Sequence, residues 1–407
     1  MKVLIAGGGP AGMMLGYLLA RGGIEATVLE KHADFFRDFR GDTIHPSTLQ
    51  LMYELGIQDD FLKLPHNEIR KLQGRIGAST VTLADFTHLP THTQFMALMP
   101  QWDFLNFLAE KAKAYPTFSL RTKTAATELL RDGDRIVGLR VKTETGEEEL
   151  RADLVVGCDG RSSTIRAAAG LPVVDLGAPM DVIWLRVSKS PDDPSQTFGN
   201  IENGRILVTL NRETYWQVAY VIPKGTFAEI QAAGIEAFRT NVAAVAPYLA
   251  DRVGEIDDWD KVSLLTVRVD RLTRWYAPGL LCIGDAAHAM SPIGGVGINL
   301  AIQDAVATAN LLYAPLRDGT LTTADLAKVQ ERRTFPTKVT QRMQVVVQNN
   351  IIKRVLGATT VARAPWFLDL FNRIPYLQRF PARLVGLGAR PEHIETPEIA
   401  PPLSSRA

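Results

Sequence analysis

The stretch KVLIAGGGPAGMMLGYLLAR, residues 2–21, carries the strongest information about the fold. A short aliphatic run typical of a buried parallel strand ends at Ala6, and a glycine-rich turn leads into an apolar helical segment. Gly7, Gly9 and Gly12 have the GxGxxG spacing. In such a turn the first glycine permits a tight bend, the second lets backbone approach a pyrophosphate, and the third lets helix and strand pack closely. The order strand, turn, helix predicts a Rossmann-like dinucleotide-binding unit.

The next strand-like run, EATVLEK, contains an acid at the expected place. Glu30 lies 18 residues after Gly12 (30 − 12), and a ribose-binding acid usually follows the glycine turn by about 20 residues. The alternative is a surface glutamate beside a purely structural turn. The glycine motif alone does not separate proteins that bind NAD from those that bind FAD, so the rest of the chain has to decide.

Two further stretches narrow the choice. The first, LVVGCDGRSSTIR (residues 154–166), is a strand that ends in an Asp-Gly turn before a helix. The second, CIGDAAHAMSPIGGVGIN (residues 282–299), runs from a strand through a Gly-Asp turn and a Pro- and Gly-rich tract into another helix. A dehydrogenase with a single Rossmann unit needs neither stretch.

Together with the N-terminal turn, these stretches resemble the three fingerprints of the group A flavoprotein aromatic hydroxylases, which have the para-hydroxybenzoate hydroxylase fold. The resemblance covers most of the first 310 residues and is nearly silent on the substrate. It implies a monooxygenase in which NADH or NADPH reduces FAD, O2 adds at the flavin 4a carbon, and the hydroperoxide hydroxylates an aromatic, quinone-like or polyketide-like small molecule. The cofactor would carry the difficult chemistry.

The resemblance also implies cofactor-binding residues. Arg40 matches an arginine that reaches the pyrophosphate, and Gln101 matches a polar residue that contacts FAD. Asp159 is linked to FAD and nicotinamide handling, with Arg166 as its expected partner, and Asp285 matches the acid on the ribityl chain. The full cofactor set is Gly7, Gly9, Pro10, Ala11, Gly12, Glu30, Lys31, Arg40, Gln101, Asp159, Arg166, Asp285, Pro292, Gly295, Gly297, Ile298 and Asn299.

The tract from Pro292 to Gly297 is expected to form a wall against the isoalloxazine ring, because glycines carry no side chain to keep the ring away. The helix beginning near Ile298 and Asn299 would then direct free amides at the pyrimidine edge of the flavin, where a helix N-terminus favours negative charge. The alternative is a buried glycine-rich turn. His288 also fits the family pattern, but we favour a hydrogen-bonded structural histidine.

Strand-like pieces with polar turns replace the helix-strand alternation between residues 179 and 260, which predicts an antiparallel sheet. In VIWLRV the period of two places Ile183, Leu185 and Val187 on a core face. The opposite face, with Trp184 and Arg186, is either solvated or a wall of the substrate pocket. The catalytic candidates are His45, Arg186, Tyr215 and Pro292; His45 could equally mark the entry to a helix before Pro46.

The predicted class is mixed α/β: a Rossmann-like FAD-binding domain with an inserted antiparallel-sheet substrate domain and a C-terminal helical region. Helices are expected at residues 298–316 and, long and amphipathic, at about 322–356. RDGD and TETG turns predict a three-stranded meander before the Asp-Gly strand. The expected division is 1–72, 97–178 and 262–320 for FAD binding, 73–96 and 179–261 for the substrate domain, and 321–407 for the C-terminal region.

Composition limits the remaining functions. With 46% hydrophobic and 22% charged residues and a formal net charge of +1, the chain resembles an ordinary globular protein and not a nucleic-acid binder. Two cysteines in no paired spacing argue against a disulfide framework or a metal site. No signal peptide or membrane span is expected, so we predict a cytoplasmic protein. A peripheral membrane contact and a homodimer are left open.

The sequence argues against one alternative function and leaves others open. A flavin-dependent halogenase needs a WxWxIP signature, whereas VAYVIP places Val218 and Tyr220 at the tryptophan positions. An epoxidase or a hydroxylase of non-aromatic substrates stays open. A flavin-binding protein without turnover and a colourless Rossmann dehydrogenase are alternatives from different classes.

Overall fold

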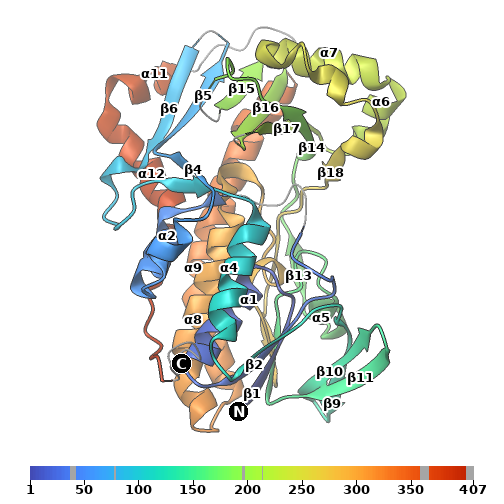
Figure 1. The fold of residues 1–407 in the computed structure, drawn as a ribbon, viewed down its shortest axis with the longest axis vertical. Helices are drawn as coiled ribbons and strands as arrows, with labels where there is room; N and C mark the ends of the chain where they lie inside the picture. Colours follow the sequence, from blue (N-terminus) through green and yellow to red (C-terminus); the bar gives the residue numbers. More distant parts are fainter. Residues whose placement is uncertain (37–42, 78, 195–197, 213, 358–365, 400–407) are drawn as a thin grey trace.

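The computed structural model describes residues 1–36, 43–77, 79–194, 198–212, 214–357 and 366–399 (Figure 1). A six-stranded sheet forms one end of the molecule, and helices α8 and α9 run along its length toward a second, seven-stranded sheet at the other end (Figure 1). The mixed α/β class predicted from the sequence is therefore what the chain adopts.

The six-stranded sheet is parallel except at one edge. β1 lies between β12 and β2 and pairs with both in parallel, and only β20 pairs antiparallel. The four inner strands, β21, β12, β1 and β2, are mostly aliphatic and buried, as expected for a sheet covered on both faces, whereas the edge strands β20 and β8 are only partly buried. Its order is β20 (Tyr276–Ala277), β21 (Leu280–Cys282), β12 (Leu154–Gly157), β1 (Lys2–Ala6), β2 (Glu25–Leu29) and β8 (Phe118–Arg121).

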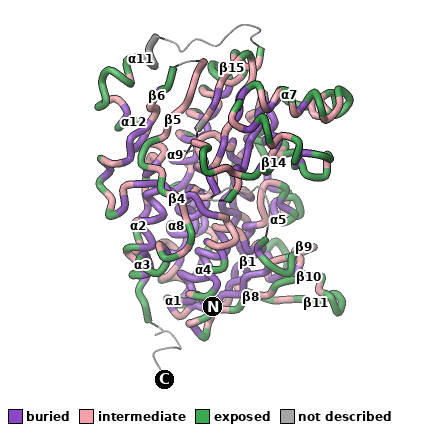
Figure 2. Tube along the Cα trace, turned by 45° about the horizontal axis from the view of Figure 1, so that its top comes forward, coloured by how far each residue is buried: buried purple, intermediate pink, exposed green. Residues whose placement is uncertain are grey.

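Three helices pack against this sheet and against one another. α1 (Pro10–Arg21) contacts α8 (Gly297–Arg317) and α4 (Gln101–Lys113). Every residue of α1 from Ala11 to Ala20 is buried, which explains its uniformly apolar sequence. Figure 2 shows mostly buried residues along α1, β1 and α8, a mixture of buried and more accessible residues along α4, and mainly exposed and intermediate residues on the outer helix α7 (Ile235–Val245).

The predicted meander is present. It consists of β9 (Ala125–Asp132), β10 (Arg135–Thr143) and β11 (Gly146–Arg151), joined antiparallel. A second small sheet joins β13 (Val173–Asp175) to β19 (Asp270–Leu272), where the chain leaves and re-enters the part built on the parallel sheet. A third joins β3 (Thr43–Ile44), β7 (Met96–Leu98) and β4 (Asn67–Ile69).

The seven-stranded sheet contains the strand-like pieces identified in the sequence and two earlier strands. One face, with Ile183, Leu185 and Val187, packs against α6 (Phe227–Ala232) and α7 (Ile235–Val245), so the predicted core face is confirmed. The order is β18 (Ser263–Leu265), β14 (Met180–Ser188), β17 (Tyr215–Pro223), β16 (Arg205–Asn211), β15 (Phe198–Glu202), β5 (Lys71–Ile76) and β6 (Ser79–Asp85).

The C-terminal helices differ from the prediction in one respect. The expected helix 322–356 consists of α9 (Thr323–Val347), a π-helical turn (Gln348–Ile352) and α10 (Lys353–Leu356). α9 is not simply amphipathic, because its buried face includes Arg333, Gln341 and Gln344, which bind polar groups of other segments. The remaining helices are α2 (Pro46–Glu54), α3 (Gln58–Phe61), α5 (Thr164–Ala168), α11 (Trp366–Arg373) and α12 (Arg379–Gly386).

No helix within the described ranges is both long and apolar enough to cross a membrane.

Candidate functional site

The three glycines of the N-terminal turn are required for three different reasons. Gly7 has φ +112°, and a Cβ there would collide with the carbonyl oxygen of Cys158 at the end of β12. A Cβ on Gly12 would collide with the carbonyl oxygen of Gly7, so this glycine lets α1 approach β1. A Cβ on Gly9 would meet no atom of the described residues within 4 Å. Of the three glycines, Gly9 is therefore the one that leaves space among the described residues, which a pyrophosphate could occupy.

Glu30 lies over this turn. Its carboxylate accepts hydrogen bonds from the amide of Gly8 (3.2 Å) and the amide of His32 (2.9 Å). These bonds orient the side chain beside the glycine turn, where a ribose would follow the pyrophosphate. Lys31, which comes next, is exposed, and Gln101 is the first residue of α4. Arg40 lies outside the described residues.

The Asp-Gly turn after β12 positions Asp159 as a helix cap. Its carboxylate accepts hydrogen bonds from the hydroxyl of Ser163 (2.5 Å) and the amide of Ile165 (3.1 Å), at the start of α5. The expected partnership of Asp159 with Arg166 was wrong. Arg166 instead forms a two-point ion pair with Asp270 of β19, with distances of 3.0 and 3.1 Å.

The Gly-Asp turn after β21 presents Asp285 at the same edge of the sheet. β21, β12 and β1 are parallel neighbours, so the turns that follow them lie side by side. Arg161 of the Asp-Gly turn reaches across to Asp285, with 3.5 Å between guanidinium nitrogen and carboxylate oxygen. About 31% of the Asp285 side chain stays exposed, so its carboxylate is available to a ligand.

The tract that follows is shaped partly by contacts inside the protein. Gly294 and Gly295 both have positive φ (77° and 63°), a conformation that favours glycine. A Cβ on Gly295 would collide with the Thr43 side chain, whose hydroxyl donates to the Gly295 carbonyl (3.0 Å). Among the described residues outside its own helical turn, the one heavy atom within 4 Å of a Cβ added at Gly297 is Cβ of Met290, at 3.8 Å. Open backbone is thus provided by Gly297 more than by Gly295.

α8 begins next to this tract with unsatisfied amides. In the described chain, no group accepts a hydrogen bond from the amides of Gly297, Ile298 or Asn299. The Asn299 side chain is occupied: its oxygen accepts from the His45 amide (2.9 Å) and the Thr48 hydroxyl (2.7 Å), and its nitrogen donates to the Thr43 carbonyl (3.1 Å). Asn299 therefore ties α2 and β3 to the start of α8, and only its amide is left for a ligand.

His45 is the residue before α2, and its carbonyl accepts the first helical amides. The structure therefore favours the helix-entry role. The imidazole is fully buried, with Nδ1 2.7 Å from the Val385 carbonyl oxygen. Burial lowers the pKa of His45 to about 4 from an ordinary 6.5, although the Val385 carbonyl acts in the opposite direction. The ring is neutral at physiological pH.

Asp304 was not identified from the sequence. Its buried side chain holds the Gly-Asp turn in place through a hydrogen bond from the turn. Its fully buried carboxylate accepts from the Gly284 amide (3.0 Å) and the His288 ring (2.6 Å) through one oxygen, and from Arg333 (2.8 Å) through the other. Burial alone would raise the pKa of Asp304, but His288 and Arg333 lower it. His288 is thus the hydrogen-bonded structural histidine that we favoured.

Three glutamines on the buried side of α9 and the turn after it were also missed. Gln344 donates to the carbonyls of Ser291 (2.8 Å) and Ile293 (3.1 Å) and accepts from the Ser291 amide (3.1 Å). Gln341 donates to the Ala289 carbonyl (3.2 Å), and Gln348 donates to the Ser291 hydroxyl (2.8 Å). Glutamines at helical spacing were the only signal in the sequence. They hold the segment that leads to Pro292, which begins the short helix Ile293–Gly295.

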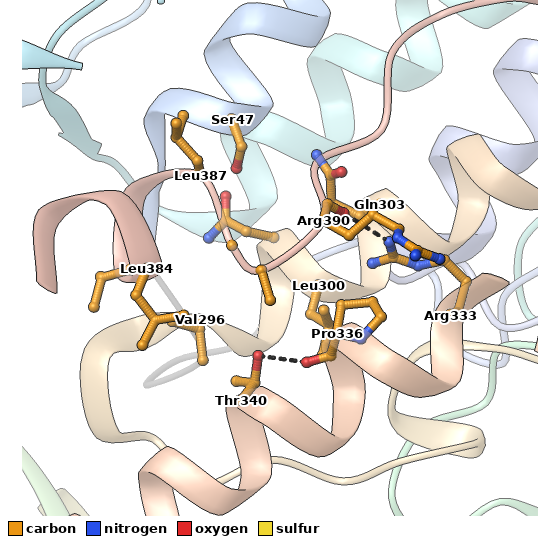
Figure 3. A pocket seen from close by; sticks show the side chains of 14 residues that line it. Ser47, Val296, Leu300, Gln303, Arg333, Pro336, Thr340, Leu384, Leu387 and Arg390 are labelled. Atoms are coloured by element: carbon orange, nitrogen blue, oxygen red, sulfur yellow. Dashed lines mark hydrogen bonds between the residues drawn. The ribbon is translucent and has the colours of Figure 1, made fainter. Parts of the chain in front are cut away.

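A small cavity lies behind the start of α8. Figure 3 shows it between Val296 and Leu300 of α8, Thr340 of α9 and Leu387 of the C-terminal segment. Its volume is about 20 Å³, enough for a water molecule or two. Gln303 and Arg333 each contribute a side-chain nitrogen without a partner in the described chain. The cavity is too small for an aromatic substrate and suits a bridging water.

Arg186 and Tyr215 come together on the seven-stranded sheet. The Arg186 guanidinium carbon lies 3.9 Å from the centre of the Tyr215 ring, a cation-π contact between β14 and β17. The apolar part of the same sheet face, including Val182 and Ala219, packs in one cluster with Ile293 of the tract after the Gly-Asp turn. This sheet face and the cofactor-type turns thus border the same region.

Comparison with known proteins gives a consistent result. The family model described as "FAD binding domain" matches residues 1–343. The 6-methylpretetramide 4-monooxygenase of Streptomyces rimosus is 30% identical to the chain, over 92% of each protein.

Two solved structures share the fold. p-Nitrophenol 4-monooxygenase PnpA of Pseudomonas putida DLL-E4 superposes with a TM-score of 0.78 at 20% identity, covering 96% of this chain and 98% of that one. PqsL, a probable FAD-dependent monooxygenase of Pseudomonas aeruginosa, gives 0.73 at 21% identity, covering 88% and 98%. At these identities the two structures show the fold alone.

The residues present fit FAD. Space above Gly9, the oriented Glu30, the accessible Asp285 and the unsatisfied amides of α8 supply suitable contacts for a pyrophosphate, ribose, ribityl chain and flavin edge. Since the family model matches most of the sequence and a 30%-identical relative aligns over nearly its whole length, the chain belongs to the FAD-binding domain family.

Proposed function

We propose that the protein is an FAD-dependent monooxygenase that uses NADH or NADPH and O2 to hydroxylate an aromatic, polyketide-type small molecule. One observation carries the proposal: the turns after β1, β12 and β21 meet at one edge of the parallel sheet, next to the tract 292–299, whose Ile293 packs against the seven-stranded sheet. The relationship to 6-methylpretetramide 4-monooxygenase supports a polycyclic substrate.

Bound FAD would supply electron transfer from the nicotinamide and activation of O2. The protein's own residues would bind and orient it. Gly9 leaves room for the pyrophosphate, Glu30 and Asp285 offer carboxylates to sugar hydroxyls, and the amides at the start of α8 favour negative charge on the neighbouring flavin edge. A helix N-terminus contributes about 0.3–2 kcal/mol to such an anion.

The substrate side would exclude water and hold the ring. Val182, Ala219 and Ile293 provide an apolar wall, and a dry, closed site suppresses side reactions of reactive oxygen species. Arg186, held against Tyr215, would orient a polar group of the substrate. No nucleophile is required, which agrees with burial raising the pKa of the thiols of Cys158 and Cys282 so that neither is a thiolate.

Three parts of the proposal rest on the sequence. We propose the same division into FAD-binding, substrate and C-terminal parts as the sequence predicts. The nicotinamide nucleotide is expected to dock transiently, because the chain has a single GxGxxG turn. The proposed location is the cytoplasm.

The test is Asp285→Ala, with Asp318→Ala, an exposed residue at the end of α8, as control. We expect the purified wild type and the control to retain FAD and the Asp285 variant to lose most of it, as measured by flavin absorbance. Unchanged FAD retention in the Asp285 variant would contradict the proposal. A panel of phenols, quinolones and polyketide-like aromatics should then accelerate NADPH consumption with little peroxide release; flavin binding without acceleration would indicate a binding protein.

A further inference from the structure

The sheet face that borders the flavin-type turns carries polar groups that the proposed function has not yet used. Along β14 this face presents Val182, Trp184 and Arg186, and along β17 it presents Gln217 and Ala219, because alternate residues point to the same side. The opposite residues form the separate core under α6 and α7. The inference below rests on the proposed function, since it concerns what this face binds.

Gln217 offers an unused donor whose orientation is fixed. Its side-chain oxygen accepts a hydrogen bond from Nε of Arg212 (3.1 Å). Because a guanidinium can only donate, the amide cannot be reversed, and its NH2 group must point elsewhere. Gln217 is only 5% exposed, and this NH2 group is buried without an acceptor anywhere in the described ranges. Buried donors are normally paired, so this one calls for an acceptor.

Trp184 offers a second unused donor on the same face. Its indole nitrogen is buried and has no partner among the described residues. An indole nitrogen can only donate. The ring itself packs with the apolar cluster that contains Ile293 of the flavin-side tract and Ile352, Val355 and Leu356 of the C-terminal helices. The donor therefore lies at the boundary between the sheet and the turns.

Arg186 completes the set, and no carboxylate of these strands competes for the donors. Arg186 is directly opposite Gln217 in the register of β14 and β17, and its guanidinium stacks on Tyr215. On this face, the alternation in β14, β16 and β17 places no aspartate or glutamate; the one acid in these strands, Asp181, is on the other face and binds Lys224 (2.6 Å). Apart from the hydroxyl groups of Ser188 and Tyr215, the residues of these strands thus give this face apolar surface and donors.

The spacing of the donors defines what they could recognise. Residues opposite one another on adjacent strands are about 5 Å apart, and residues two apart on one strand are separated by about 6.6 Å. We propose that Gln217 and Trp184, together with Arg186, are specificity-determining residues that select a fused-ring aromatic bearing two or more carbonyl or phenolate oxygens, over one with a single oxygen.

The experiment measures this preference directly. FAD-loaded protein without nicotinamide nucleotide is titrated in a calorimeter with 1,8-dihydroxyanthraquinone. A separate titration uses 1-hydroxyanthracene, which has the same tricyclic carbon skeleton but a single oxygen. We expect the wild type to bind the dihydroxyanthraquinone at least about tenfold more tightly, which corresponds to about 1.4 kcal/mol.

Two variants separate recognition from a structural role. Gln217→Glu keeps the shape and the acceptor for Arg212 but replaces the donor by an acceptor, so the preference should fall about tenfold or more. Trp184→Phe keeps an aromatic ring but removes the indole N–H together with the pyrrole ring that carries it, and should lower the preference severalfold. The controls are Gln231→Glu on α6 and Trp259→Phe in the core below the sheet, which should leave it unchanged.

The outcomes are distinguishable from failure of the proposed function. A wild type without preference, or a preference that survives both Gln217→Glu and Trp184→Phe, overturns this inference while FAD binding and oxygenation can still stand. If Gln217→Glu fails to retain FAD, Trp184→Phe decides alone. A protein that binds FAD but neither aromatic, and shows no substrate-stimulated NADPH consumption, contradicts the proposed function itself.

Discussion

Some glycines of the cofactor turns are required by contacts within the protein, and others leave room that a ligand could occupy. Gly7 and Gly12 are required by neighbouring backbone, whereas no atom of the described residues would contact a Cβ at Gly9. A glycine in this turn that packing within the protein does not require is explained if a bound ligand needs the space that a Cβ would occupy. The same distinction separates Gly295, which contacts Thr43, from the open Gly297.

Alanine at two of these glycines should therefore affect different properties: the stability of the fold at Gly12 and the binding of FAD at Gly9. Gly12→Ala forces α1 away from the turn and should destabilise the protein by about 1–3 kcal/mol or more, as overpacking does. Gly9→Ala has backbone angles that alanine tolerates (φ −74°), so the apoprotein should keep its melting temperature while FAD binds at least about tenfold more weakly. Calorimetry and flavin-fluorescence titration measure the two effects. Gly254→Ala, which meets nothing within 4 Å, is the control.

His45 makes stability depend on pH. The folded protein holds its ring neutral down to about pH 4, whereas the unfolded chain protonates it near 6.5. Protons therefore bind the unfolded state preferentially, and the stability from this residue, complete above pH 6.5, is lost as pH falls toward 4. The loss amounts to about 3 kcal/mol.

Urea unfolding at pH 7 and pH 4.5 of wild type and His45→Asn measures this contribution. The asparagine can still donate to the Val385 carbonyl but does not titrate. Other groups affect both proteins alike, so the difference between the two pH dependences isolates His45. Parallel dependences would mean that the ring is not held neutral.

At the scale of elements, one long helix positions the segment on which the flavin ring would lie. α9 and the turn after it contribute Gln341, Gln344 and Gln348 to the backbone and one hydroxyl of the segment 289–293. This explains why the buried face of α9 is polar: among the described residues the amide and carbonyl of Ser291 have no backbone partner and are paired by Gln344 instead, and buried peptide groups need some partner.

Gln344→Leu should therefore affect the cofactor without touching it. The variant leaves the Ser291 amide and the carbonyls of Ser291 and Ile293 without their partner, at a cost of about 1–3 kcal/mol for each group that water does not reach. We expect a lower urea midpoint and weaker FAD binding. The exposed neighbour Val346→Gln should change neither. A Gln344 variant with normal FAD affinity would show that the segment keeps its position without this side chain.

At the scale of the whole molecule, a buried charge network joins the Gly-Asp turn to the C-terminal segment. Asp304 binds Arg333, and Arg333 binds Glu392 (2.9 Å), which also pairs with Arg332. Beyond Glu392 the chain contacts the end of α1 and the residues that follow α4, where Arg21 and Tyr115 bind Glu398. These contacts therefore hold the last described residues against the FAD-binding part.

Breaking this network from the inside should cost much more than breaking a surface pair. Asp304→Asn leaves the buried Arg333 partly uncompensated, and loss of one partner of a buried ion pair typically costs about 3–5 kcal/mol. Asp318→Asn, at the exposed end of the same helix, should have no measurable effect. Urea unfolding compares them, and limited proteolysis should cut the Asp304 variant faster near residue 392. Equal midpoints for the two variants would mean that the network contributes little.

Much of the fold could be predicted because it is encoded locally. The strand-turn-helix order at residues 2–21, the meander before β12 and the alternating faces of β14 all follow from periodicity and turn residues within one segment. The helix 322–356 was predicted in position, but its polar inner face was not, because glutamines at helical spacing look the same whether water or a neighbouring segment receives them.

The glycine turns, the acids that follow the strands and the family they indicate can be read from the sequence, since each depends on residues close together in the chain. Three features become known only from the folded chain. Arg166 pairs with Asp270, 104 residues away, Asn299 and Asp304 use their side chains on the protein, and the donors of Trp184 and Gln217 share one face without acceptors among the described residues. Periodicity assigns a residue to a face, but its partner depends on which distant segment packs there, and that is fixed only when the whole chain folds.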